Sequence, residues 1–234
     1  MKELLLFCSY LVYSIQSCDV KDVEYYAGRF DISFSEYNST GLPYNRKWLT
    51  HDEWQGRHIK NAKTRSAFSE WKATYRDSFI IKWAEHAVAE SKVSKIPASI
   101  IISQAILESN WGISRLAATA NNYFGHKYRK NKNKMYIVAA DDSPNDKFAV
   151  YKSIWWCIRD HSNILNGMYK RRLKGNTAED WLESLCGGMN ASQSKKFVKR
   201  GNMVYATSCF KRNPCYSQKL KSIIRTYNLT KYDI

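Results

Sequence analysis

The segment from Ile96 to Gly112 constrains this chain more than any other, because it has the pattern of a buried helix that carries one carboxylate. Pro97 suits the first helical position, where its missing N–H costs nothing, and Gly112 suits the end of a helix. Gln104 and Glu108 are four residues apart, so the spacing puts them on one face. Burial raises the pKa of a carboxyl group, and a raised pKa is what a general acid needs at neutral pH.

Glu108 also has an ordinary interpretation, as a solvated residue in the last helical turn or as the partner of Arg115. For a glutamate taken alone this interpretation is the better one, because structural carboxylates outnumber catalytic ones. The residues that surround Glu108 favour the catalytic interpretation.

The run from Ile96 to Lys127 resembles the glucosaminidase family, glycoside hydrolase family 73, also described as mannosyl-glycoprotein endo-β-N-acetylglucosaminidase-like. The family pattern is P-A-S-x-x-x-A-Q-A-x-L-E-S-G-W-G, then S-x-L-A, then N-N-x-F-G-I-K. This chain has P-A-S-I-I-I-S-Q-A-I-L-E-S-N-W-G, S-R-L-A and N-N-Y-F-G-H-K. Residues 160–165, 204–207 and 216–233 look like later motifs of Bacteroidetes-type members, so the resemblance covers about residues 79–233.

The resemblance implies a lysozyme-like, mainly α fold of the α+β kind, in which a helical lobe and one β-hairpin lobe flank a glycan cleft. It implies cleavage of the β-1,4 glycosidic bond after N-acetylglucosamine in peptidoglycan. The glutamate that matches Glu108 is the family's catalytic acid, and the tyrosine that matches Tyr205 orients catalysis or substrate. We expect four further residues to shape the cleft: Trp111, Asn122, Tyr123 and Phe124.

The second carboxylate departs from the family pattern. Many members place a glutamate on the hairpin, whereas this chain has none between Glu108 and Glu179. Bacteroidetes-type members carry aspartates at the place of Asp141 and Asp142, so we expect one of these two to act, with Asp141 slightly ahead. The equal alternative is that both belong to an ordinary hairpin turn that includes Asp146.

Three mechanisms stay open. Inverting glycosidases hold two carboxyl groups about 6.5–9.5 Å apart, retaining ones hold them about 5–5.5 Å apart, and substrate-assisted ones use the sugar's acetamido group. Two other departures look tolerable: Asn110 stands where the family has glycine, and His126 stands where it has isoleucine. We expect neither position to carry the proton transfer.

An aromatic pattern precedes the Glu108 segment. Aromatic residues recur at helical spacing and predict a long helix that ends near Ser91 and turns its rings inwards. A short helix is expected over residues 116–120. The aromatic residues are Phe68, Trp71, Tyr75, Phe79 and Trp83.

The second half of the chain adds one hairpin and three helices. Residues 136–140 and 147–151 read as two strands around a Pro-Asn turn. Ser153 and Thr177 suit the starts of two helices, and Pro214 suits the start of the last one. The pattern alone therefore predicts a mainly helical fold with a single hairpin.

The N-terminus suggests export. Residues 1–17 read as a signal peptide, because the apolar stretch Leu4–Ile15 is too short to span a bilayer permanently. The residues before Cys18 weakly resemble a lipobox, with Cys18 as the lipidated residue. We expect a periplasmic, outer-membrane-anchored or extracellular protein. The alternative is a buried N-terminal helix. Residues 18–68 would form an extension or linker of unknown function, and residues 69–234 the catalytic domain.

The cysteines fit an oxidising compartment. Setting aside Cys8 and Cys18 leaves four thiols, which allow three pairings. A disulfide between Cys209 and Cys215 would staple an insertion that the family lacks. The other two thiols are Cys157 and Cys186.

The net charge of +16 fits attraction to an anionic surface such as cell-wall polymer or acidic lipid. We expect a monomer whose partners are peptidoglycan glycan strands, with membrane attachment through Cys18 if that residue is lipidated. We expect no nucleic acid, metal or organic cofactor. The main alternative is a non-catalytic cell-wall-binding module, supported by the missing hairpin glutamate. A basic nucleic-acid-binding protein would rest on charge alone.

Overall fold

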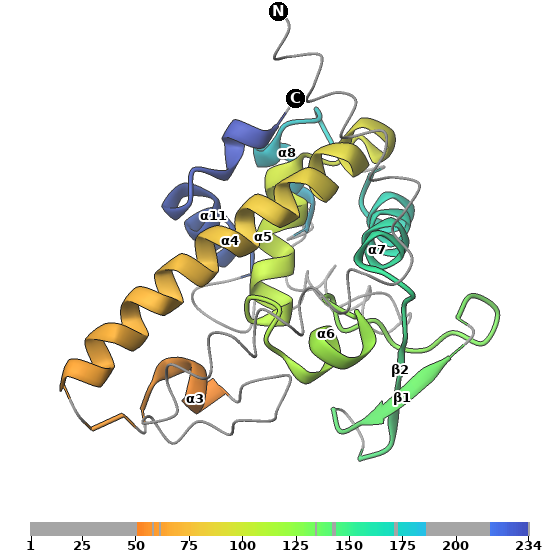
Figure 1. Ribbon diagram of the computed structural model, residues 1–234. Helices are drawn as coiled ribbons and strands as arrows, with labels where there is room; N and C mark the ends of the chain where they lie inside the picture. Colours follow the sequence, from red (N-terminus) through yellow and green to blue (C-terminus); the bar gives the residue numbers. More distant parts are fainter. Residues whose placement is uncertain are drawn as a thin grey trace, which may run out of the picture.

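The computed structural model describes residues 51–185 and 216–233, except residues 58, 61, 134, 142, 143, 171 and 172. Within these ranges it is mainly helical with one two-stranded antiparallel sheet, so the predicted fold class is confirmed (Figure 1). The elements are α3 (His51–Gln55), α4 (Ala62–Ser94), α5 (Ala98–Ser109), α6 (Arg115–Ala120), β1 (Tyr136–Ala139), β2 (Asp146–Ala149), α7 (Ile154–Met168), α8 (Ala178–Leu185), α11 (Tyr216–Thr226) and the 3-10 helix η3 (Leu229–Tyr232).

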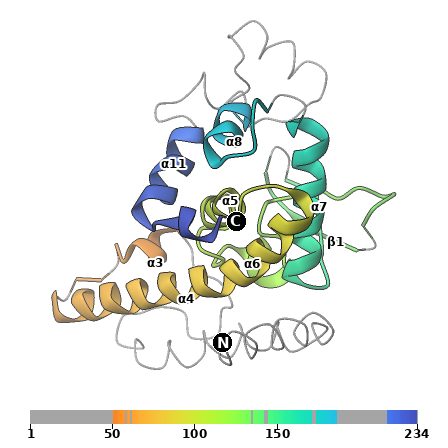
Figure 2. The same ribbon diagram turned by 90° about the horizontal axis from the view of Figure 1, so that it is seen from above.

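Helix α5 lies at the centre of the molecule. Helices α4, α8, α11 and η3 all pack against it, and Figure 2 shows α5 nearly end-on with other helices around it. Ile100, Ile101 and Ile102 point in three successive directions and are all fully buried. A helix that is apolar on all sides must be enclosed in this way, so the predicted burial of the segment is confirmed.

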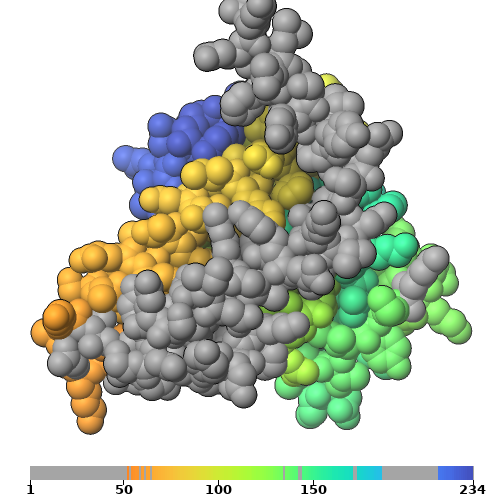
Figure 3. Space-filling model, viewed as in Figure 1, coloured from red at the N-terminus to blue at the C-terminus, as the bar shows by residue number. Residues whose placement is uncertain are grey.

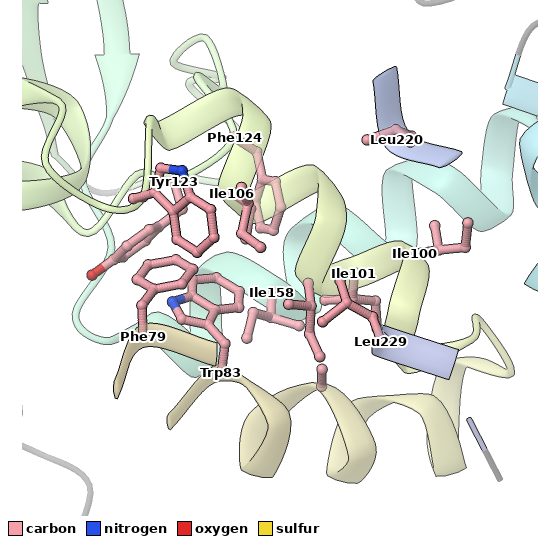
Figure 4. Packing of buried hydrophobic residues seen from close by; sticks show 14 of the residues in the cluster. Phe79, Trp83, Ile100, Ile101, Ile106, Tyr123, Phe124, Ile158, Leu220 and Leu229 are labelled. Atoms are coloured by element: carbon pink, nitrogen blue, oxygen red, sulfur yellow. The ribbon is translucent and has the colours of Figure 1, made fainter. Parts of the chain in front are cut away.

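Helix α4 is the longest element and crosses the face seen in Figure 1. It runs from Ala62 to Ser94, slightly beyond the predicted end near Ser91. Its aromatic residues face inwards as predicted, and Figure 4 shows Phe79 and Trp83 in the core beside residues from α5 and α7. The space-filling view shows α4 as an orange-to-yellow band across this face (Figure 3).

The helical body includes residues before position 69. Trp54 of α3 is buried and lies edge-on to Trp71 and Tyr75 of α4, with ring centroids 6.0 and 5.6 Å away. Ile59 also belongs to the core. The expected domain boundary between residues 68 and 69 therefore falls within α4, and part of the expected extension packs with the helical body.

The hairpin projects from the helical body beyond α6 (Figure 1). Tyr136 pairs with Ala149 and Ala139 with Asp146, close to the predicted strands. Only β2 reaches the core, since Phe148 and Ala149 are buried while β1 has no buried residue. The hairpin is thus joined to the rest of the protein through β2.

Two of the later helices, α7 and α8, begin as the sequence predicts. Ser153 is the N-cap of α7, although its side chain makes no capping hydrogen bond. Thr177 and Asp180 form a reciprocal cap at α8: the backbone N–H of each donates to the other's side chain, at 2.9 and 3.2 Å. The expected start of the last helix at Pro214 lies outside the described residues. Within the described residues, α11 begins at Tyr216.

The described residues bear on the expected membrane attachment and disulfides only in part. No helix of the described residues is long and apolar enough to cross a bilayer, and residues 1–17 are not among them. Cys157 is a buried free thiol. The other cysteines, including Cys18 and the expected Cys209–Cys215 pair, lie outside the described residues.

Candidate active site

The turn after α5 holds Glu108 in place. Three successive residues adopt positive φ angles: Asn110 at 50°, Trp111 at 64° and Gly112 at 75°. Asn110, not Gly112 as predicted, is therefore the C-cap of the helix. A positive φ is unfavourable for a tryptophan, and the Tyr75 hydroxyl helps to hold this backbone by donating to the Trp111 carbonyl at 2.9 Å.

Gly112 is required for a second reason besides its φ angle. A Cβ atom at this position would lie 2.9 Å from the Phe79 ring and 3.2 Å from the Tyr123 ring. The Ser109 hydroxyl accepts a hydrogen bond from the Gly112 N–H at 2.7 Å and donates to the Ala105 carbonyl at 2.5 Å. The chain thus reverses tightly over the last turn of α5, next to Glu108.

Glu108 occupies that last turn and its side chain reaches solvent. Protein nevertheless surrounds the carboxyl group densely, and this burial raises its pKa. A hydrogen bond from Tyr216 and the positive charge of Lys219, both on α11, oppose the rise without cancelling it. A carboxyl group that is accessible and yet has a raised pKa has the properties of a general acid. No ion pair with Arg115 accounts for Glu108; its described partners come from α11.

Tyr216 connects Glu108 to a buried glutamine. The Gln104 amide Nε2 donates to the Tyr216 hydroxyl at 3.1 Å, while that hydroxyl bonds the Glu108 carboxyl. The Gln104 Oε1 atom lies 3.1 Å from Nε2 of His161 on α7. Gln104 and His161 are fully enclosed by protein. Hydrogen bonds therefore lead from the helix face that Gln104 and Glu108 share into the core.

The contacts continue beyond His161. Its Nδ1 lies 3.1 Å from Nε2 of His126, and Nδ1 of His126 lies 2.7 Å from the Tyr151 hydroxyl. The Tyr151 hydroxyl donates to Oδ2 of Asp160 at 2.6 Å, and Arg129 pairs with the same oxygen. We call this series the polar row; in order, it comprises Glu108, Tyr216, Gln104, His161, His126, Tyr151 and Asp160.

The pKa values along the polar row diverge. Burial lowers the pKa of His126 to about 4, with Asp160 opposing the shift and Arg129 adding to it. Burial also holds the pKa of His161 well below its usual value. At Asp160 burial acts to raise the pKa, but hydrogen bonds from Tyr151 and Arg129 outweigh it and lower the pKa. At neutral pH both histidines are therefore neutral and Asp160 is ionised.

Asn122 joins the turn after α6 to the hairpin. Its side-chain Nδ2 donates to the carbonyls of His126 and Ala149, both at 2.9 Å, and its Oδ1 accepts from the His126 N–H at 2.9 Å. The side chain is almost fully buried. Asn122 thus fixes the loop on which His126 lies, and the role in shaping a cleft expected for it stays a prediction.

The other three expected cleft residues are also nearly buried. Tyr123 lies edge-on to Trp83 with centroids 4.9 Å apart, and Phe124 stacks on His161 at 3.7 Å with the rings 3° from parallel. Trp111 lies edge-on to Phe79 and Tyr227. These rings support the Glu108 turn and the polar row by packing. Their contact with substrate stays a prediction.

The hairpin aspartates are only partly described. Asp141 is half-exposed and pairs with Nζ of Lys127 at 2.7 Å, and the same ammonium group pairs with Asp146 at 2.7 Å. Asp142 and Tyr205 lie outside the described residues. Lys127 thus holds Asp141 beside the hairpin turn, an arrangement that suits a structural as well as a catalytic role.

Sequence reasoning missed most of the polar row. The sequence indicates Gln104 only as a neighbour of Glu108 on one helix face, and His126 only as a tolerable departure from the family pattern. One available signal was a glutamine in a mostly apolar segment, because a buried amide needs partners. Within the described ranges no three His, Cys, Asp or Glu side chains come together as a metal site.

Comparison with known proteins gives a consistent family. Residues 84–229 match the Glucosaminidase family, described as mannosyl-glycoprotein endo-beta-N-acetylglucosaminidase. Exo-glucosaminidase LytG of Bacillus subtilis (strain 168) is 30% identical over 167 residues, or 66% of this chain and 52% of that protein. A probable N-acetylmuramidase of Lactococcus lactis subsp. cremoris is 29% identical over 174 residues, or 67% of this chain and 35% of that protein.

A solved structure is also similar to about two thirds of the chain. The catalytic domain of the autolysin Auto from Listeria monocytogenes has a TM-score of 0.48 and 27% identity, over 68% of this chain and 88% of that domain. This chain spans about half the length of the Bacillus relative and about a third of the Lactococcus one.

Proposed function

Because this chain belongs to the glucosaminidase family, a family of glycoside hydrolases, we propose that it hydrolyses the β-1,4 glycosidic bond after N-acetylglucosamine in peptidoglycan. The observation that carries the proposal is Glu108: an accessible carboxyl group with a raised pKa, in the last turn of the central buried helix. Glu108 gives its proton to the glycosidic oxygen as the bond from that oxygen to the anomeric carbon breaks. A general acid placed in this way contributes about 10²–10⁴ in rate.

The second carboxylate is Asp141 or Asp142. It either takes a proton from the attacking water or stabilises the positive charge that develops on the sugar ring. Lys127 bonds both Asp141 and Asp146, so movement of the hairpin would carry these groups together. The sequence pattern of the Bacteroidetes-type members supports this choice. The inverting, retaining and substrate-assisted mechanisms all remain compatible with Glu108 as the acid.

Other parts of the proposal concern substrate and location. Tyr205 positions the substrate or the attacking water. Four further residues shape the sugar site: Trp111, Asn122, Tyr123 and Phe124. The protein acts outside the cytoplasm, where peptidoglycan lies, either free or attached to a membrane through lipidated Cys18. The Bacillus relative is called an exo-glucosaminidase and the Lactococcus relative a probable N-acetylmuramidase, so the bond that is cut is the first point to test.

The test is digestion of purified peptidoglycan by the full chain, wild type beside Glu108→Gln. Mass spectrometry of the borohydride-reduced products identifies the sugar at each new reducing end. The proposal predicts ends in reduced N-acetylglucosamine for the wild type and a loss of about 10²–10⁴ in rate for the variant. The variant keeps the size and shape of the side chain and removes its acidic proton and its charge.

Each other outcome has a distinct meaning. Ends in reduced muramic acid would keep Glu108 as the acid but move the cleaved bond to the other linkage. Full activity of Glu108→Gln would reject Glu108 as the acid. Binding of sacculi without any release by the wild type would indicate a non-catalytic wall-binding module.

A further inference from the structure

The polar row joins two carboxyl groups through five neutral side chains. Its six contacts run from Glu108, which reaches solvent, to Asp160 in α7. The five contacts from Tyr216 to Asp160 measure between 2.6 and 3.1 Å. Its middle members, Gln104, His161 and His126, are buried. Water therefore cannot reach these atoms to supply a missing hydrogen bond. The number of protons in the row then decides whether every contact is a hydrogen bond.

Each contact in the row needs one hydrogen between its two heavy atoms. An ionised carboxylate only accepts, a tyrosine hydroxyl or neutral imidazole supplies one hydrogen, and an amide supplies one hydrogen on its nitrogen side. The five neutral residues between the carboxylates therefore supply five hydrogens for six contacts. With both carboxylates ionised, one contact must bring two acceptors together without a hydrogen.

The place of the missing hydrogen can be located. When Nε2 of Gln104 faces Tyr216, every hydrogen between His126 and Glu108 points toward Glu108. The Tyr151 hydroxyl then has one hydrogen for two acceptors, Nδ1 of His126 at 2.7 Å and Oδ2 of Asp160 at 2.6 Å. Two lone pairs would face each other at a distance that suits only a hydrogen bond.

We propose that the polar row is one proton short when both of its carboxylates are ionised, and that Glu108 takes up the missing proton. When Glu108 donates to Tyr216, every hydrogen in the row can point toward Asp160, and all six contacts are satisfied. This reversal requires the Gln104 amide to turn over, so its orientation follows the protonation of Glu108. Asp160 and His126 compete poorly for the proton, since Arg129 pairs with the former and burial excludes charge from the latter.

The proposal rests on the proposed function, because it explains how Glu108 is kept in the acid form. The residues from Tyr216 to Tyr151 are positioning residues, since they act through Glu108. Other charged groups act on the row without supplying the proton: Lys219 favours ionised Glu108, Arg129 favours ionised Asp160, and the thiol of Cys157 near Tyr151 stays protonated because burial raises its pKa.

The proton count makes an unusual prediction for Tyr151→Phe. This change removes two contacts and one hydrogen, so the four remaining contacts have four hydrogens and no longer need a proton from Glu108. The pKa of Glu108 should fall by about one to two units, because an unsatisfied buried polar contact is worth that much. Tyr151 does not touch Glu108, and the change leaves Tyr216 and Lys219 intact.

His126→Ile is the second variant. Isoleucine stands at this position in the family pattern, and the change shortens the row to three contacts with three hydrogens. The pKa of Glu108 should again fall by about one to two units. Tyr169→Phe is the matched control, because it removes a hydroxyl from another buried tyrosine outside the polar row and should leave the pKa of Glu108 unchanged.

The measurement is a carbon-13 NMR titration of the glutamate side-chain carboxyl groups in the full chain, with Glu108 assigned by its loss in Glu108→Gln. The alkaline limb of kcat/KM against pH should shift by the same amount. An unchanged or raised pKa of Glu108 in both row variants, with folding confirmed by circular dichroism, would overturn the proposal. If Glu108→Gln remained fully active, the proposed function would fail, while the titration would still decide whether the row controls Glu108.

Discussion

Asp233 caps the helix that carries Glu108, although it lies 134 residues beyond Ser99 in the first turn of that helix. Its two carboxylate oxygens accept from the N–H and the hydroxyl of Ser99, both at 2.8 Å. Pro97, the N-cap residue, makes no side-chain hydrogen bond of its own. A carboxylate at a helix N-terminus satisfies free N–H groups and interacts favourably with the helix dipole.

Replacement of this cap should be costly. Asp233→Ala is expected to lower the free energy of unfolding by about 1–2 kcal/mol, measured by urea denaturation. Asp52→Ala is the control, because it removes the same charge from an exposed pair with Arg57 and should change the value by less than about 0.5 kcal/mol. Equal effects of the two variants would show that Asp233 contributes nothing specific.

Gly112 and Gly125 allow strain and crowding to be separated. Both have positive φ angles, 75° and 65°, but only Gly112 has neighbours where a Cβ would lie. Gly125→Ala should cost about 1–2 kcal/mol of stability from backbone strain alone. Gly112→Ala adds a clash with Phe79 and should cost about 2–5 kcal/mol. Thermal and urea unfolding of both variants measure the difference, and equal losses would mean that the core yields freely at Phe79.

The pair of Glu90 and Arg159 should make stability depend on pH. Glu90 is buried, and burial raises the pKa of its carboxyl group. The positive charge of Arg159 opposes this rise, because its Nη2 atom lies 3.1 Å from Oε2 of Glu90. Arg159→Met should lower the free energy of unfolding by about 3 kcal/mol at neutral pH, because an ionised carboxylate is left buried without its partner.

The sign of this effect follows from linkage. A carboxyl group with a raised folded-state pKa stabilises the protein below its unfolded pKa, and this stabilisation is lost as pH rises through the folded pKa. The loss in Arg159→Met should therefore shrink below the ordinary pKa of glutamate and grow above it. Adding Glu90→Gln to Arg159→Met should remove most of the pH dependence. A penalty that stays constant with pH would assign the effect to lost packing of the arginine.

The activity itself should fall at high pH. Glu108 must be protonated to act as an acid, so kcat/KM declines as pH rises through its pKa. Because burial raises that pKa, the decline should lie above the range of an ordinary glutamate. Rates on soluble peptidoglycan fragments across pH measure it. A decline centred in the ordinary range would mean that the protein does not favour the acid form.

The helices and the hairpin could be predicted because local patterns determine them. The isoleucines and Glu108 of α5, the aromatic stripe of α4 and the Thr177 cap are all visible within a few residues. The C-cap was expected at Gly112 but lies at Asn110, because asparagine and glycine both tolerate a positive φ angle. Residues 110–112 all adopt positive φ angles, so the sequence does not show which of them ends the helix.

The polar row could not be predicted in the same way. Its members come from α5, α7, α11, the loop after α6 and the segment between β2 and α7. No periodicity links Gln104 with Tyr216, 112 residues away. At His126 the sequence shows only a departure from the family pattern, because a single position says nothing of its neighbours in space. The packing of Trp111 and Tyr123 against α4, and of Trp111 against Tyr227 just after α11, could not be predicted either. Their expected role in shaping a cleft stays a prediction.

The two ends of α5 are both held by the last part of the sequence, with Asp233 at Ser99 and Tyr216 at Glu108. A ribosome delivers α5 more than a hundred residues before it delivers either partner. Throughout that interval the nascent helix lacks its cap, and Glu108 lacks the hydroxyl that bonds it. The glutamate on which the proposed reaction depends therefore reaches its final surroundings only when synthesis has passed Asp233, so a truncated translation product would carry the family motif without a finished site.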